Sequence, residues 1–276
     1  MSFKTIMAII GGDRAHDDVA AALQAAAEIN AHLSVLLVGI AAPPTVGDYP
    51  VGTGWIERRD EDLKDLEATR KQTDSQCRAS GVAYDITLAY SERASLEDML
   101  FQKAIYCDLV MIGRSIVQAK GLEAAVVDAV VFEARRPLVV VPEDRHVTLK
   151  PKRILLAWDS KAEAAHAATA ALDLLIQAEQ VNLVVVDPDT LFWRNGEEPG
   201  ADAALFLARH GVNVMVDQMA SGGRAVEVVL QQHAVDLDAE LMVMGAYGHS
   251  RMRQRIFGGV TTSILAQTRL PVLLAR

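Results

Sequence analysis

Two copies of one pattern fill this chain, in which short apolar runs alternate with segments whose apolar residues recur at helical spacing. The first copy predicts strands at residues 4–10, 33–40, 83–89, 108–112 and 137–141. After a polar linker at residues 143–152, the second copy predicts strands at residues 153–159, 181–186, 212–216, 240–244 and 271–274. A helix between consecutive strands lets the strands run parallel, with helices on both faces. We therefore predict an α/β fold of two tandem, open, five-stranded parallel sheets, in domains that cover residues 1–146 and 147–276.

The length, charge and apolar segments of the chain limit the kind of protein that it encodes. With 276 residues, 51% of them hydrophobic, the chain can bury a core in each copy. A net charge of -9 argues against a general nucleic-acid binder. The first apolar run is a strand and not a signal peptide, and no apolar run reaches the ~20 residues of a membrane span. We expect a cytoplasmic protein with no membrane partner, in which Cys77 and Cys107 are reduced thiols.

A glycine-rich stretch near the C-terminus is the strongest indication of function. An apolar run ends at Gly245, Gly248 follows two residues later, and nine residues with three arginines lead to Gly258. Residues with helical spacing come next, so the stretch predicts a strand, a loop and a helix. Glycines in such a loop can present bare backbone N–H groups to an anion, and the helix dipole adds positive charge there.

This stretch resembles the nucleotide loop of the universal stress protein family. The family pattern is Gly, two residues, Gly, nine residues and Gly, closely followed by Val-Thr. Gly245, Gly248, Gly258, Val260 and Thr261 match the pattern, whereas Gly259 stands where the family usually has a hydroxyl residue. Both copies resemble universal stress protein domains, so the chain resembles the tandem form of that family. The resemblance implies Rossmann-like sheets of the adenine nucleotide alpha hydrolase type, and a regulatory, ATP-binding role in the stress response.

The resemblance also implies where an adenine nucleotide would bind in the second copy, with ATP as the ligand, either alone or with Mg²⁺. Asp159 would reach the ribose hydroxyls or a metal on the phosphates, although an Asp there is also suited to cap the next helix. Trp158 would line the adenine pocket or belong to the core. The arginines would touch phosphate at one or two positions, or form a solvated loop. The predicted nucleotide-binding residues are Ala157, Trp158, Asp159, Val185, Val186, Met244, Gly245, Gly248, Arg251, Gly258, Gly259, Val260 and Thr261.

The first copy has lost the residues that this site requires. Its run from Ala124 to Asp128 aligns with the run from Gly258 to Thr262, and Ile116 stands in place of Gly248. Alanine blocks close approach of the backbone, and a carboxylate repels phosphate. The strand that ends at Asp13 mirrors the strand that ends at Asp159. We expect one nucleotide per chain, while the first copy either serves packing alone or holds a different ligand.

No GxSxG, HExxH or Walker-type motif is present in the sequence, so no catalytic or metal-binding residue is predicted. Three functions stay open: a nucleotide-responsive binding module, which we favour, a slow ATPase or nucleotidyl-transferring enzyme using Asp159 and a divalent metal, and an interaction scaffold. The apolar strands that follow Pro137 and Pro271 should lie at sheet edges, and unpaired apolar edges are normally covered. By analogy with the family, they would pair the two halves as a pseudo-dimer within the chain. Further association into a homodimer stays open.

Overall fold

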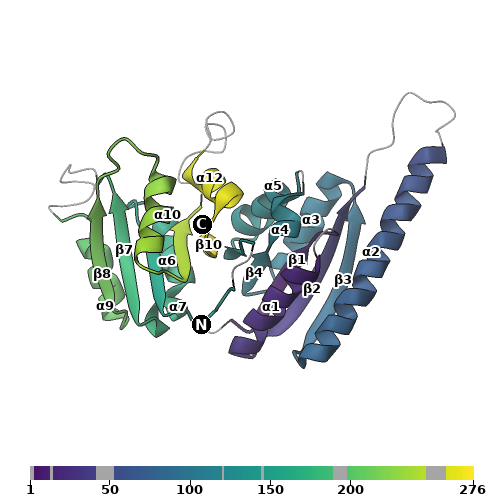
Figure 1. Cartoon of the computed structure of the whole chain (residues 1–276), viewed down its shortest axis with the longest axis horizontal. Helices are drawn as coiled ribbons and strands as arrows, with labels where there is room; N and C mark the ends of the chain where they lie inside the picture. Colours follow the sequence, from purple (N-terminus) through teal and green to yellow (C-terminus); the bar gives the residue numbers. More distant parts are fainter. Residues whose placement is uncertain are drawn as a thin grey trace. The chain divides into compact units, whose positions relative to one another are not determined.

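The computed structural model describes residues 3–12, 15–41, 53–119, 121–143, 146–188, 198–246 and 259–276. The chain forms two compact units, Phe3–Arg136 and Pro137–Arg276 (Figure 1). Each unit is built on a mainly parallel sheet with helices packed against it, which confirms the predicted α/β class. In the part of the chain that the structure describes, no helix is both long and apolar enough to cross a membrane.

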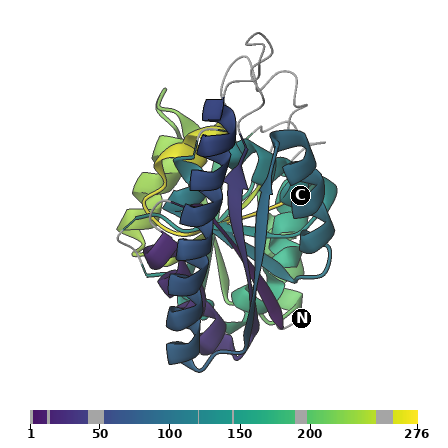
Figure 2. The ribbon, with the colours of Figure 1, turned by 90° about the vertical axis from the view of Figure 1, so that its right-hand side faces the viewer.

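The N-terminal unit holds four parallel strands in the order β3-β2-β1-β4. The apolar side chains of β1, β2 and β4 are buried almost throughout, as expected where helices cover both faces. Helix α2 packs against α1 and the strands β2 and β3, and Figure 2 shows it running alongside this sheet. The strands are β1 (Thr5–Ile10), β2 (His32–Ile40), β3 (Tyr84–Ser91) and β4 (Leu109–Ile112). The helices are α1 (Ala15–Ile29), α2 (Thr53–Ser80), α3 (Arg93–Ala104), α4 (Arg114–Val117), α5 (Leu122–Val127) and the π-helix η1 (Asp128–Glu133).

The C-terminal unit holds six strands in the order β5-β10-β9-β6-β7-β8. Five of them are parallel, and β5 is antiparallel to its neighbour β10. The strands are β5 (Leu138–Val140), β6 (Arg153–Ala157), β7 (Gln180–Val186), β8 (Val214–Met219), β9 (Leu241–Gly245) and β10 (Val272–Ala275). The helices are α6 (Ala162–Ala170), α7 (Leu172–Gln177), α9 (Ala201–Arg209), α10 (Val226–Asp236) and α12 (Val260–Gln267).

The last strands of the two copies pair with each other, as the sequence predicts. Val139 lies opposite Leu273, and Leu138 lies opposite Leu274. Without β5, the fully buried apolar strand β10 would be an open sheet edge, which proteins avoid. Because of this pairing, β5 belongs to the C-terminal unit, and the strands divide into four and six instead of five and five. The domain limits 1–146 and 147–276, and a pseudo-dimer of two whole domains, remain predictions about the repeat.

The two cysteines are free and buried, as expected of reduced thiols. Burial raises the pKa of the Cys77 thiol to about 11 and that of the Cys107 thiol to about 12. Since the thiolate is the reactive form, both side chains are packing residues at neutral pH.

Candidate functional site

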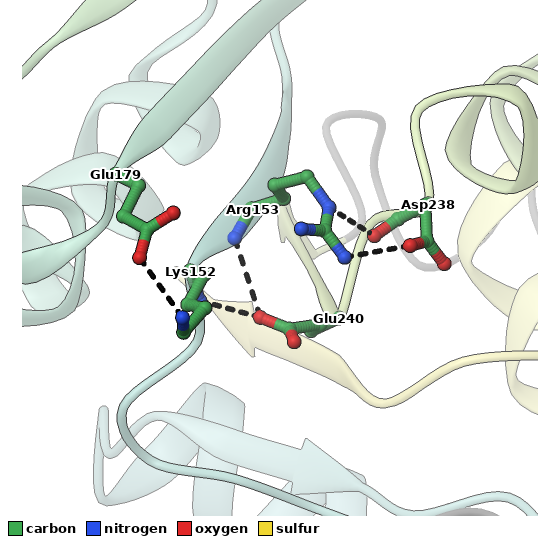
Figure 3. A network of polar contacts seen from close by, with 5 residues as sticks. All are labelled: Lys152, Arg153, Glu179, Asp238 and Glu240. Atoms are coloured by element: carbon green, nitrogen blue, oxygen red, sulfur yellow. Dashed lines mark hydrogen bonds and ion pairs between the residues drawn. The ribbon is translucent and has the colours of Figure 1, made fainter.

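In each unit a carboxylate accepts hydrogen bonds from backbone N–H groups at the amino end of a neighbouring strand. In the C-terminal unit the Glu240 carboxylate accepts hydrogen bonds from the backbone N–H groups of Lys152 and Arg153 (Figure 3). The Arg153 side chain donates to the Asp238 carboxylate at 2.7 Å, and Lys152 pairs with Glu179 on the surface. These contacts join the start of β6 to the start of β9.

The N-terminal unit has the same arrangement, made by a different acid. The Asp108 carboxylate accepts hydrogen bonds from the backbone N–H groups of Lys4 and Thr5, at 2.8 and 3.0 Å. We call the Asp108 and Glu240 contacts the amino-end clips. Because the two sheets share this register, residues at their carboxyl ends can be compared position by position.

The predicted site lies where the strand order of the C-terminal unit reverses. Strand β6 has β9 on one side and β7 on the other, and ligands of open α/β sheets bind outside the carboxyl ends at such a point. The structure brings together there Ala157 at the end of β6 and Trp158 directly after it, with Val186 at the end of β7 and Gly245 at the end of β9. Val185 and Met244 precede these ends and are buried. Trp158 is half-buried, and its backbone N–H donates to the carbonyl of Val184.

The glycine at the end of β9 is required by close packing against α6. A Cβ atom at Gly245 would lie 2.6 Å from the backbone nitrogen of Ala164 and from the carbonyl carbon of Glu163. No side chain fits there without moving backbone. The predicted loop therefore starts with its main chain pressed against the beginning of a helix.

The predicted loop is followed in the chain by α12. This helix starts at Val260, and Gly259 is its N-cap, so no cap side chain bonds the first-turn N–H groups. Thr261 is buried in that first turn. The predicted site residues Gly248, Arg251 and Gly258 lie outside the described residues, and their roles remain predictions.

Asp159 lies where it supports the start of a helix, which is the alternative role that the sequence left open. Its carboxylate accepts a hydrogen bond from the backbone N–H of Lys161, the N-cap of α6, and another from the Lys161 ammonium at 2.7 Å. About half of the Asp159 side chain is exposed. The carboxylate therefore supports the start of α6 and also faces solvent beside the carboxyl end of β6, so it can exchange partners.

Asp187 at the rim of this site was not among the predicted residues. It adopts a left-handed backbone conformation, with φ 46°, directly after β7. Its carboxylate accepts a hydrogen bond from the backbone N–H of Ser221, and the Ser221 hydroxyl and backbone lower the pKa of this carboxyl. The contact fixes the loop after β7 to the turn after β8. An Asp before a Pro-rich loop is the only signal in the sequence, and it is not specific.

In the N-terminal unit the position of Asp159 is taken by Gly11. The backbone N–H of His32 donates to the carbonyl of Lys4, and the backbone N–H of Gln180 donates in the same way to the carbonyl of Lys152. The strand register therefore aligns Lys4 with Lys152 and Gly11 with Asp159. The sequence comparison aligned Asp13 instead, which is wrong by two residues because it matched the loops and not the strands. The backbone N–H of Gly11 donates to the buried Ser115 hydroxyl at 2.9 Å.

A second residue that the sequence did not reveal occupies the start of the N-terminal loop. The Asp18 carboxylate accepts hydrogen bonds from the backbone N–H groups of Arg114 and Ser115, at 3.2 and 3.0 Å. Burial raises the pKa of Asp18, while hydrogen bonds from the side chain and backbone of Ser115 act against this rise. An Asp one turn into a helix normally indicates only a solvated, dipole-stabilised helix start. Here it puts an internal anion beside Gly113, where an added Cβ would lie 2.0 Å from the carboxylate.

The fold defines an open α/β protein in which the strand order reverses beside β6. Residues 150–276 match the model of the universal stress protein family. A universal stress protein of Synechocystis sp. is 25% identical over 178 residues, which cover 61% of this chain and 58% of that protein. This chain thus spans just over half the length of that curated relative.

Solved structures agree on the fold. The crystal structure of a universal stress protein from Archaeoglobus fulgidus is similar over 100% of this chain and 97% of its own, with a TM-score of 0.72 and 16% identity. A functionally unknown protein from Pseudomonas aeruginosa is similar over 99% of this chain and 92% of its own, with a TM-score of 0.61 and 16% identity. The C-terminal copy thus matches the sequence model of the universal stress protein family, and the fold of the chain is similar to that of a solved universal stress protein.

Proposed function

We propose that this chain is a tandem universal stress protein that acts as an ATP-binding regulatory module, with one nucleotide site in its C-terminal copy. The observation that carries the proposal is the pair of backbone positions that bracket the loop. Gly245 ends β9 at a place where no Cβ fits, and Gly259 starts α12 without a capping side chain. A loop held in this way can direct main-chain N–H groups at phosphate oxygens.

The predicted site residues would divide the parts of the nucleotide among them. The backbone at Val185 and Val186 would hold the adenine ring, and Trp158 would line the pocket beside it. The Asp159 carboxylate would give up its contact with Lys161 and accept hydrogen bonds from the ribose hydroxyls. Where Mg²⁺ accompanies ATP, the carboxylate would help to hold that ion. The phosphates would lie on the loop and the first turn of α12, with Arg251 giving one exposed, salt-sensitive contact. A cytoplasmic location and a role in the stress response go with this function.

The test uses the full chain. The purified protein should carry an adenine nucleotide that mass spectrometry identifies, and calorimetry with ATP should give a stoichiometry near one. Gly258→Ala should weaken ATP binding strongly, because its methyl group would enter the space between phosphate oxygens and backbone N–H groups. Equal affinities for the wild type and Gly258→Ala would remove the loop from the proposal. A turnover assay with the same protein separates a binding module from a slow ATPase.

A further inference from the structure

Both oxygens of the Asp159 carboxylate are bonded by one residue, Lys161. One oxygen accepts a hydrogen bond from the Lys161 backbone N–H at 3.2 Å, and the other accepts one from the Lys161 ammonium at 2.7 Å. Ser160 between them adopts a left-handed backbone conformation, with φ 59°, which costs free energy for a residue that has a side chain. The backbone is therefore strained at the point where the chain places an ammonium on this carboxylate.

This ion pair lies at the crevice of the C-terminal unit, where the strand order reverses. It directly follows β6, and Lys161 is the N-cap of α6. The first turn of α6 packs against Gly245, the start of the loop that the proposed function assigns to the phosphates. The Lys161 and Asp159 side chains are 40% and 51% exposed, so the ammonium is free to leave the carboxylate for another anion.

The described rim of this crevice carries further carboxylates that would repel a triphosphate. Glu163 lies in the first turn of α6, and its Cβ would be 2.9 Å from a Cβ at Gly245. Asp187 directly follows β7. Because like charges repel most strongly where water is partly excluded, a polyphosphate beside these groups needs a cation. The Lys161 ammonium, a compact charge on a flexible stem, is suited to supply it.

A divalent ion fits the Asp159 carboxylate less well than this internal cation does. Mg²⁺ requires near-octahedral oxygen ligands at about 2.0–2.1 Å and is usually held by one or two carboxylates together with phosphates. To reach Asp159, the ion would have to displace the Lys161 ammonium, and two cations would then lie side by side. The chain already has its own cation at the position that the ion would take.

The first copy has the opposite charge at the corresponding place in the sequence. Because the strand register aligns Gly11 with Asp159, Asp13 corresponds to Lys161 when residues are counted on from the strands. The copy with the complete glycine pattern thus carries the ammonium, and the copy without that pattern carries a carboxylate. This reversal is expected if the side chain at this position faces phosphate in the second copy alone.

We propose that Lys161 is the built-in counter-cation of the C-terminal site. Its ammonium passes from the Asp159 carboxylate to a phosphate of the nucleotide, while the carboxylate turns to the ribose hydroxyls, so that ATP binds without a divalent ion. The inference rests on the proposed ATP site and names the cation that this site uses.

The experiment is calorimetry with ATP on the full-length chain, once in excess Mg²⁺ and once in EDTA. The wild type should bind ATP with affinities that agree within about threefold in the two conditions. Lys161→Met should bind about tenfold or more weakly in EDTA, because it removes the cation and leaves Asp159 uncompensated. Mg²⁺ should restore most of this loss, since the ion can then take the place of the ammonium. Lys161→Arg keeps the charge and should behave as the wild type does.

Two further variants give the loss its location. Lys152→Met makes the same substitution at the other end of β6, where the side chain pairs with Glu179, and should leave ATP binding unchanged in both conditions. Lys161→Met combined with Asp159→Asn should show no restoration by Mg²⁺, because the carboxylate that would hold the ion is gone.

The outcomes separate this inference from the proposed function. The inference is overturned, while the ATP site stands, if the wild type needs Mg²⁺ for binding by about tenfold or more. The same holds if Lys161→Met binds ATP in EDTA as tightly as the wild type does, or if Mg²⁺ restores none of its loss, which would indicate a structural role. If the wild type binds no ATP in either condition, the proposed function is overturned and this inference with it.

Discussion

The two copies of the repeat are alike at the amino ends of their strands and different at the carboxyl ends. Asp108 and Glu240 make the same clip to the first strand of their copy. At the other end, Gly11 stands where the second copy has Asp159, and Asp18 fills the space beside Gly113. The comparison teaches that the core and the amino-end clips maintain the fold, while the carboxyl ends are free to diverge. It also shows that an internal carboxylate can satisfy backbone groups that a ligand would otherwise bond.

The largest expected effect concerns the aligned positions Gly258 and Ala124. Gly258→Asp should raise the dissociation constant for ATP by a factor on the order of a thousand, because it removes two or three hydrogen bonds to phosphate and adds a negative charge. Ala124→Asp introduces the same carboxylate at an exposed position of α5 and should leave ATP affinity unchanged. Calorimetry measures both. A stoichiometry of two in the wild type, or a large loss with Ala124→Asp, would show that the copies are not asymmetric.

A smaller effect is expected at the pair Gly11 and Asp159. A Cβ at Gly11 would lie 2.8 Å from the carbonyl oxygen of Ser115, which is backbone and cannot move freely. Gly11→Ala should therefore reduce the free energy of unfolding by about 1–3 kcal/mol.

Asp159→Ala should reduce that free energy by less, up to about 1 kcal/mol, since it removes only the support at the start of α6. Denaturant unfolding of both variants measures the difference. If Asp159→Ala proved the more destabilising of the two, Asp159 would be mainly structural, which would weaken its assignment to the nucleotide site.

The amino-end clips should behave alike. Asp108→Ala and Glu240→Ala each leave two backbone N–H groups without their carboxylate, so each should reduce the free energy of unfolding by about 1–2 kcal/mol. Glu179→Ala removes only a surface ion pair with Lys152 and should change stability by less than about 0.5 kcal/mol. If one clip variant changed the free energy of unfolding as little as Glu179→Ala does, the two amino-end clips would not be equivalent.

The smallest expected effect is a pH dependence of stability that comes from Asp18 in the N-terminal copy. Burial raises the folded-state pKa of Asp18, with Asp17 acting in the same direction. A raised carboxyl pKa contributes stability that is fully present below its ordinary value and is lost as the pH rises through the folded-state value.

The stability of the wild type relative to Asp18→Asn should therefore fall as the pH rises from the ordinary carboxyl pKa through the raised folded-state pKa. Urea unfolding of both proteins across that range measures the trend. A relative stability that rises with pH would mean that the hydrogen bonds from Arg114 and Ser115 outweigh burial, so that the folded-state pKa is lowered.

Much of the architecture could be predicted from periodicity because it depends on local pattern. The ten strands and their order along the chain follow from apolar runs and helical spacing, whereas the pairing of the last strands was implied by the family resemblance. Boundaries were less certain. The segment between the strands predicted at residues 153–159 and 181–186 forms two helices that meet at Ala171, and β8 extends to Met219 instead of ending at Val216. The sequence does not predict this extension because the polar Asp217 ends the apolar run. In the structure, the Asp217 carboxylate stays within β8 because it contacts Asn182 and His233 from other elements.

The sequence by itself determined the repeat, the α/β class and the loss of the glycine pattern in the first copy, since each is written in residues that are near one another in the chain. Only the tertiary structure decided that Gly11 corresponds to Asp159 and that Asp18 occupies the first loop. Asp18 and Ser115 are 97 residues apart, and their contact depends on the placement of α1 beside the end of β4. Local pattern carries no information about such a meeting, because side chains from distant segments come together only when strand order and register are fixed.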